Sequence, residues 1–347
     1  MKRTLRMLCA LLSLLMLLSL GGCGDAPVQQ QIFSMDTVMT LTAYGRKAED
    51  GLDAAIDIIN AMDQSLDPES EGGIAYQLNH ANGEKITVPP QIADMLRTAY
   101  SVYQHSNGAL DLSVYPIYKA WGGFKQETGR VPGSEELSAL RELRHFGEME
   151  ITEFAGEANF SVWLPAGTEL SFGAVAKGFA ADYAIDAMKK AGVTSGIVSL
   201  GGNVQTLGCK PDGTLWTVAV EDPKEPGDYI GTLGVADAAI VTSGSYQRYF
   251  TGDGGAVYHH IINPSTGKPV ENELLSVTIV CEDGTLADCL STAMFVLGPN
   301  AAMKYWRQNG GFDMILVTND GHVRCTTGLI EVFTLTDTEN YTVDFIE

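Results

Sequence analysis

Apolar positions recur along this chain of 347 residues with two different periods. Four segments show the spacing of an amphipathic helix, in which apolar side chains return every three or four residues. These segments are 48–66, a stretch whose apolar positions run from Ile92 to Tyr103, 174–191 and 286–297. Asn107-Gly108 follows the second and Gly298-Pro299 the fourth, and both pairs are typical helix stops.

Short runs rich in apolar and β-branched residues predict strands over much of the remaining chain. They are 33–44, 194–200, 215–220, 229–235, 238–242, 256–262, 275–281, 312–317 and 329–336. Helices and strands come in mixed order, without the regular spacing of βαβ units, so the pattern favours an α+β fold over a doubly wound parallel sheet. No linker, low-complexity tract or clear repeat divides 32–347, which we expect to form one large compact unit of mixed sheets with packed helices.

The N-terminal segment has the pattern of a bacterial lipoprotein signal. Three basic residues precede an apolar run over 7–20, which is too short to span a membrane comfortably. The run ends in Leu20-Gly21-Gly22-Cys23, small residues before a cysteine, as a lipoprotein signal peptidase requires. We expect residues 1–22 to be removed, Cys23 to carry lipid at the outer face of the bacterial membrane, and 23–31 to form a tether. The alternative is an ordinary signal peptide with an incidental cysteine.

Charge and cysteine content narrow the possible partners. Removal of 1–22 would leave 19 basic and 43 acidic residues, a net charge of −24. Such a chain is unsuited to bind nucleic acid or anionic lipid surfaces, and a polyphosphate ligand would have to be held locally.

The four cysteines that follow Cys23 show no CxxC spacing. We expect them to be small core residues, with one disulfide as the alternative; they are Cys209, Cys281, Cys289 and Cys325.

Two segments carry residues suited to phosphate chemistry. His260 begins a polar loop after an apolar strand, and Asp288 and Thr292 stand four residues apart on a predicted helix, hence on one face. A titratable base and two hard oxygen ligands suggest Mg²⁺-assisted phosphate chemistry. The alternative for His260 is a core histidine bonded to backbone. His259 should point the other way in an extended segment, and we assign it no role.

Other polar and glycine-rich points have two interpretations each. Gly201-Gly202-Asn203 is either a simple turn or a place where backbone approaches a ligand. Lys177-Gly178 starts a helix and could meet an anion, or Lys177 could be a solvated surface charge. Asp111-Leu112-Ser113 could bind ribose hydroxyls, although capping of the next turn is the safer interpretation. Thr242-Ser243-Gly244 by itself is a turn, and no GxGxxG, Walker, GxSxG or HExxH motif is present.

Taken in order, these segments resemble the ApbE family, the FAD:protein FMN transferases, from Met35 to about Gly298. Eight blocks in the right order carry the resemblance. They are Met35-Asp36-Thr37, 74–79, 107–113, 173–182, 200–203, 242–246, 259–267 and 287–293.

The resemblance implies an α+β fold related to the T-fold, Mg²⁺ as cofactor and FAD as substrate. FMN would be transferred through its phosphate to a threonine of an acceptor flavoprotein with a Ser/Thr-Gly-Ala-Thr-like motif, with release of AMP. By matched position, the implied metal ligands are Asp288, Thr292 and the backbone oxygen of Ala174. The implied FAD-binding residues are Met35, Tyr76, Asp111, Lys177, His260 and Ile261, with His260 as the catalytic base. A histidine fits that role because its ordinary pKa lies near the working pH.

This sequence departs from the family pattern at three positions. Ser171 and Asn263 stand where aspartate is common, and Leu112 stands where proline is common. Ser171 could change the hydrogen bonds around the metal loop. Two other functions stay open: a Mg²⁺-dependent FAD pyrophosphatase, in which water replaces the threonine, and a flavin-binding lipoprotein without turnover.

Overall fold

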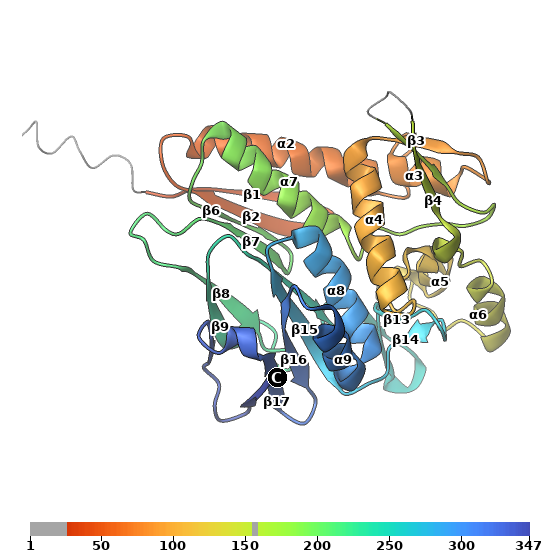
Figure 1. The fold of residues 1–347 in the computed structure, drawn as a ribbon. Coiled ribbons are helices and arrows are strands. Elements are labelled where there is room, and N and C mark those ends of the chain that lie inside the picture. The colour runs from red at the N-terminus through yellow and green to blue at the C-terminus, as the bar shows by residue number, and fades with distance from the viewer. Residues whose placement is uncertain (1–25, 155–158) are drawn as a thin grey trace, which may run out of the picture.

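A nine-stranded sheet forms the centre of the computed structural model, which describes residues 26–154 and 159–347 (Figure 1). Its strand order is β1-β2-β6-β7-β10-β15-β16-β17-β19, and every neighbouring pair is antiparallel except the parallel pair β17 and β19. The strands are β1 (Val28–Ser34), β2 (Thr37–Ala43), β6 (Gly196–Leu200), β7 (Asn203–Leu207), β10 (Ala239–Gly244), β15 (Leu274–Cys281), β16 (Asp313–Thr318), β17 (His322–Thr326) and β19 (Thr342–Ile346).

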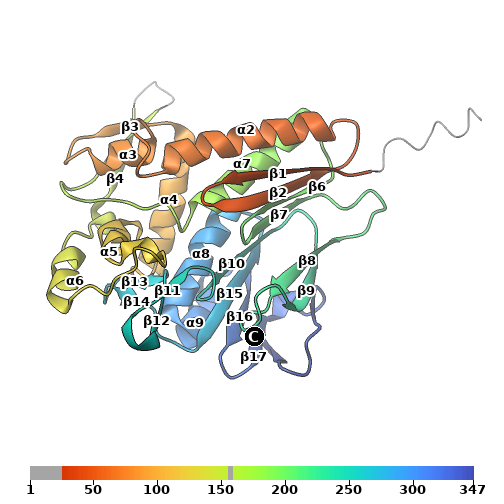
Figure 2. The same cartoon turned by 180° about the vertical axis from the view of Figure 1, so that it is seen from behind.

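Helices cover one face of this sheet and a small sheet covers part of the other. α2 (Ala48–Leu66) and α7 (Ala176–Ala191) lie over the β1–β7 half, and α8 (Gly284–Leu297) lies over β10 and β15. α4 (Pro90–His105) and α9 (Pro299–Asn309) pack against α8. The opposite face carries β8 (Trp216–Glu221), β9 (Tyr229–Val235) and β18 (Phe333–Leu335), in the order β18-β9-β8. Figure 2 shows β8 and β9 beside the central sheet.

Alternation along the central strands explains this layering. On β16, Met314 and Leu316 pack into the core beneath the helices, while Ile315 and Val317 pack against the small sheet. Side chains of a strand point to alternate faces, so a strand that is apolar at every position must be covered on both sides.

Smaller elements complete the fold at one end of the sheet. β3 (Ile86–Val88), β5 (Phe160–Trp163) and β4 (Glu150–Glu153) form a second three-stranded sheet, and β11 (Tyr249–Thr251) with β12 (Val257–His259) and β13 (Ile262–Asn263) with β14 (Lys268–Pro269) form two hairpins. The short helices are α3 (Ile74–Asn79), α5 (Tyr115–Ala120) and α6 (Ser134–Arg141). Single 3₁₀ turns cover Leu112–Val114, Gly122–Phe124, Phe146–Glu148, Asp253–Gly255 and Thr327–Leu329.

The α+β class, the single compact unit and all four predicted helices are confirmed, with ends shifted by a few residues. The single strand predicted over 33–44 is wrong. The chain reverses at Met35 and Asp36, whose φ angles of 49° and 59° are left-handed, so β1 and β2 form a hairpin. β1 already begins at Val28, so residues 28–31 of the segment expected as a tether belong to a strand.

Two other strand predictions are partly wrong. The segment 256–262 is interrupted between β12 and β13, and 329–336 contains only the three residues of β18. The four cysteines of the described ranges are free, which excludes a disulfide between them. No helix in the described part of the chain is long and apolar enough to cross a membrane. Residues 1–25, including Cys23, lie outside the described residues.

Candidate active site

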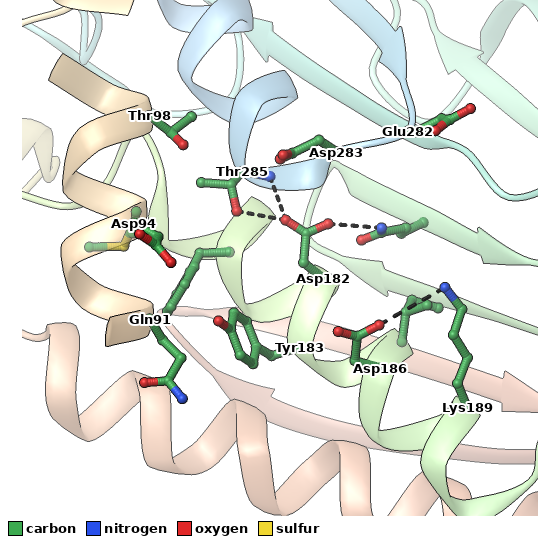
Figure 3. Close-up of a pocket in the computed structure, with 14 residues that line it drawn as sticks. Gln91, Asp94, Thr98, Asp182, Tyr183, Asp186, Lys189, Glu282, Asp283 and Thr285 are labelled. Carbon is green, nitrogen blue, oxygen red and sulfur yellow. Dashed lines mark hydrogen bonds and ion pairs between the residues drawn. The ribbon is translucent and has the colours of Figure 1, made fainter. Parts of the chain in front are cut away.

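The N-terminal ends of α7 and α8 meet, and each is capped by a carboxylate from the other helix. Asp288 on α8 accepts a hydrogen bond from the backbone N–H of Gly178 at 2.9 Å. Asp182 on α7 accepts the backbone N–H groups of Gly284 and Thr285, each at 2.8 Å, and Figure 3 shows this carboxylate between the two helices. The first N–H groups of a helix lack intrahelical acceptors and favour negative charge. The two aspartates therefore fix how the helices cross.

Glycine is required on both sides of this crossing. A Cβ atom on Gly178 would lie 2.0 Å from the carbonyl oxygen of Gly284 and 2.8 Å from the Cβ of Asp288. A Cβ on Gly284 would lie 2.8 Å from the carbonyl oxygen of Gly178. The glycine of the Lys177-Gly178 pair thus allows the close approach that places Asp288 beside the start of α7.

Three oxygens near this crossing suit a hard cation. Asp288 is buried; its Oδ2 meets Gly178, and no protein donor meets its Oδ1 among the described residues. Thr292 lies one turn further along α8, with its Oγ1 3.4 Å from the Oγ of Ser243 on β10. The carbonyl of Ala174 precedes α7 and loses its helical partner, because the N–H of Gly178 donates to Asp288 instead.

No group of three His, Cys, Asp or Glu side chains that could hold a metal occurs in the described ranges. A cation here would depend on one carboxylate, one hydroxyl and one carbonyl. That donor set fits Mg²⁺, which keeps several waters and binds substrate phosphates at its remaining positions.

His260 lies at the interruption between β12 and β13, half-buried. Its Nδ1 is 3.2 Å from the carbonyl oxygen of Arg248, which also accepts the His260 backbone N–H at 3.0 Å. A carbonyl only accepts, so the neutral ring carries its proton on Nδ1 and keeps a lone pair on Nε2. Burial, helped by the cations of Arg248 and Lys177, lowers the pKa of His260 to about 3. This pKa lies well below the ordinary value of histidine, so the ring is neutral at neutral pH in the protein without substrate.

The neighbouring His259 uses both ring nitrogens in hydrogen bonds to backbone, consistent with the prediction that it points away from His260. The Nε2 of His259 donates to the carbonyl of Val270 at 2.9 Å, and its Nδ1 accepts the N–H of Ile261 at 3.3 Å. Burial lowers the pKa of His259 as well. With both nitrogens bonded, His259 positions the buried Ile261 and has no free atom for chemistry.

The Met35 turn reaches the same end of the sheet as His260. A Cβ on Gly201 would lie 2.3 Å from the Oγ1 of Thr37, and one on Gly202 would lie 3.3 Å from the Nε2 of Gln247. The turn between β6 and β7 thus packs against the Met35 turn on one side and against the loop that leads to Arg248 on the other. Asp36 and Arg248 line one hollow of 360 Å³.

Tyr76 and Asp111 are connected to the loop that precedes α7. Tyr76 lies on α3, and the side chain of Asn79 on that helix bonds the backbone of Leu170 through both its oxygen and its nitrogen, at 2.7 and 2.9 Å. The N–H of Ser171 donates to the carbonyl of Leu112 at 2.8 Å, next to Asp111. The loop that carries Ala174 is therefore held from both segments.

Asp111 caps the turn that follows it, which confirms the safer interpretation. Its Oδ1 accepts the N–H of Ser113 at 2.9 Å and its Oγ at 2.6 Å, while its Oδ2 pairs with Arg144 at 2.9 Å. Both oxygens of this buried carboxylate already have protein partners.

The departures from the family pattern differ in their effects. The Oδ1 of Asn263 accepts the N–H and the Oγ of Ser265 at 2.9 and 2.7 Å, bonds that an aspartate would also make. The Oγ of Ser171 accepts the N–H of Gly173 at 3.4 Å, a longer and neutral bond next to Ala174.

A second hollow, of 390 Å³, lies between α4, α7 and the start of α8 (Figure 3). None of the site residues predicted from the sequence lines it. Its acidic lining would repel a diphosphate, so we do not place the active site there. The acidic residues are Asp94, Asp182, Asp186, Glu282 and Asp283. Burial raises the pKa of Asp182, while its hydrogen bonds from Thr285, Gln205 and Gly284 act in the opposite direction.

Sequence reasoning missed two contributors, Asp182 as a helix cap and Arg248 as a neighbour of His260. The cap joins residues about 100 positions apart, so the residues next to Asp182 in the sequence do not predict it. The position of Arg248 could have been predicted, since the glycine-rich turn at 252–255 is typical of a hairpin. The observed register pairs Tyr249 with His259, which puts Arg248 opposite His260.

Comparison with known proteins identifies the family of the chain. The model of the ApbE family matches residues 35–316. A FAD:protein FMN transferase of Vibrio cholerae serotype O1 is 30% identical over 332 residues, 90% of this chain and 94% of the relative, and one of Klebsiella pneumoniae is 34% identical over 247 residues, 70% of this chain and 74% of the relative. The crystal structure of the ApbE protein from Thermotoga maritima superposes with a TM-score of 0.79 at 26% identity and covers 88% of this chain and 98% of its own. The flavinyl transferase ApbE of Pseudomonas stutzeri gives a TM-score of 0.73, also at 26% identity, with 90% and 95% covered. The chain belongs to the ApbE family.

Proposed function

We propose that this protein is a FAD:protein FMN transferase that moves FMN from FAD to a threonine of an acceptor flavoprotein and releases AMP. The observation that carries the proposal is the hydrogen bond between His260 Nδ1 and the carbonyl of Arg248, which leaves Nε2 free to accept a proton. The cations of Arg248 and Lys177 help to keep this ring neutral by lowering its pKa. A proton acceptor beside a cation is what phosphoryl transfer to a hydroxyl needs. The names of the relatives above support the same reaction.

The residues divide the reaction between them. His260 Nε2 takes the proton of the threonine hydroxyl as its oxygen bonds to the phosphorus of the FMN phosphate, and the bond to the AMP phosphate breaks with its electron pair on AMP. Lys177 and the start of α7 bind the phosphates. The diphosphate adds negative charge near the ring, which raises the pKa of His260 above its value in the free protein and lets it hold the proton.

Asp288, Thr292 and the carbonyl of Ala174 would hold Mg²⁺. When bound, this ion neutralises charge on the phosphate oxygens. Met35, Tyr76, Asp111 and Ile261 complete the proposed FAD site.

We also propose that the enzyme works outside the cell, anchored at the outer face of the membrane by lipid on Cys23. The signal pattern of residues 1–23 supports this placement. The acceptor would then be an exported flavoprotein domain with a Ser/Thr-Gly-Ala-Thr-like motif.

The test is incubation with FAD, Mg²⁺ and such an acceptor domain, followed by acceptor mass and nucleotide analysis. We expect an acceptor heavier by one FMN group, an equal amount of AMP, no modification when the acceptor threonine is replaced by alanine, and no reaction in excess chelator. AMP and free FMN with an unmodified acceptor would instead identify an FAD pyrophosphatase. Bound FAD without products would identify a flavin-binding protein.

A further inference from the structure

We propose that Arg248 is a catalytic residue that binds the phosphoryl group in transit, together with Lys177. The inference rests on the proposed function and deepens it, because it assigns a phosphate contact to a residue of the β11–β12 hairpin.

The hairpin places Arg248 beside His260. Tyr249 pairs with His259, so Arg248 and His260 are the next directly opposite pair, and the backbone N–H of His260 donates to the carbonyl of Arg248 at 3.0 Å. Side chains of directly opposite residues project from the same face, with Cβ atoms about 5 Å apart. The guanidinium therefore shares a side of the hairpin with the imidazole that would take the threonine proton.

The guanidinium is free to bind a ligand. Arg248 is exposed, and its side chain has no hydrogen bond or ion pair within the described ranges. Asp36 lines the same 360 Å³ hollow as Arg248, but the two side chains form no ion pair. In a chain with a net charge of −21, an unpaired arginine at the end of a strand pair is a local site for an anion.

Arginine suits this task because its fork of N–H groups matches two phosphate oxygens at once. Arg248 stands opposite His260 in the hairpin, and the cations of Arg248 and Lys177 both lower the pKa of the His260 ring. As the threonine oxygen bonds to phosphorus and AMP leaves, Arg248 donates hydrogen bonds to the non-bridging oxygens and transfers no proton. Such donors stabilise charge that grows in the transition state.

The test compares Arg248→Gln and Arg248→Lys with Lys125→Gln in the full-length enzyme. Lys125 is an exposed cation that lines the same hollow but lies outside the β11–β12 hairpin, so it is a matched control. FMN transfer is measured against acceptor concentration at saturating FAD, and the dissociation constants of FAD and riboflavin are measured separately. Riboflavin lacks the phosphates.

We expect Arg248→Gln to lower the rate at saturating acceptor by about 10²–10³-fold, the usual loss for one transition-state donor. Arg248→Lys should recover part of that rate, riboflavin affinity should be unchanged, and Lys125→Gln should behave as wild type. Three results would overturn the inference: a near-wild-type rate in Arg248→Gln, a higher acceptor KM with a normal saturated rate, or an equal loss of riboflavin and FAD affinity. If the wild-type protein binds FAD but forms no product, the proposed function fails, and this inference fails with it.

Discussion

Replacing Gly178 with alanine tests the crossing of α7 and α8. The new Cβ would lie 2.0 Å from the carbonyl oxygen of Gly284, and both atoms belong to backbone, so the helices must separate by about 1.4 Å to restore an ordinary contact. Overpacking of this kind costs about 1–3 kcal/mol, and each strained helix cap adds about 1 kcal/mol. The higher helix propensity of alanine returns about 1 kcal/mol. We therefore expect the free energy of unfolding to fall by about 2–4 kcal/mol.

That loss corresponds to a Tm lower by about 3–6 °C for a domain of this size, measured by calorimetry. The rate of FMN transfer should also fall at temperatures where the variant is fully folded, because the displacement moves Asp288 away from Ala174. Gly234→Ala is the control: its Cβ would lie 3.6 Å from the Cδ1 of Leu215, an ordinary contact, so we expect almost no change. A Gly178→Ala protein as stable and active as wild type would refute the close helix crossing.

Four further predictions concern Asp288, His260 and Cys23. The Asp288→Asn side chain can still accept the Gly178 N–H but has no charge, so this variant should keep a Tm close to wild type and lose FMN transfer by orders of magnitude. Asp288→Ala should lose both stability and transfer, and an active Asp288→Asn enzyme would exclude Asp288 as a metal ligand. His260→Gln should slow transfer by about 10²–10⁴-fold with little change in FAD affinity, and a weaker FAD affinity at a normal rate would exclude the base. Because the pKa of His260 is lower in the folded protein, the unfolded chain binds its proton first; wild-type stability should decline as pH falls from 6.5 towards 3, and denaturant midpoints should show a smaller decline in His260→Gln. Cys23→Ser should leave an active enzyme that partitions into the aqueous phase of a detergent phase separation, and retention in the detergent phase would indicate another anchor.

The parts of the fold that follow local periodicity could be predicted from the sequence. The apolar stripe of 48–66 predicted α2 to the residue, and the spacing of Asp288 and Thr292 correctly placed them on one helix. The separate environments of His259 and His260 followed from strand alternation. In each case neighbours in the chain decide the structure.

The errors occurred where distant contacts or unusual backbone angles decide the structure. Met35 and Asp36 take left-handed angles without a glycine, so nothing in 33–44 announced the reversal. The short strand β18 exists because it pairs with β9, 100 or more positions earlier. The helix caps, and the low pKa that burial gives His260, likewise depend on tertiary contacts.

The reciprocal caps also determine when the site can exist during folding. The bond from Gly178 to Asp288 spans 110 positions and that from Gly284 to Asp182 spans 102. All strands from β6 to β15 lie between the two helices in the sequence. Contacts between residues so far apart form only after a large loop has closed, and they slow the folding of a domain. A chain that has made α7 but not yet α8 has neither Asp288 in place nor a fixed start of α7. At the proposed site, FAD binding must therefore follow folding, and we expect a fragment that ends before Asp288 to bind neither metal nor FAD.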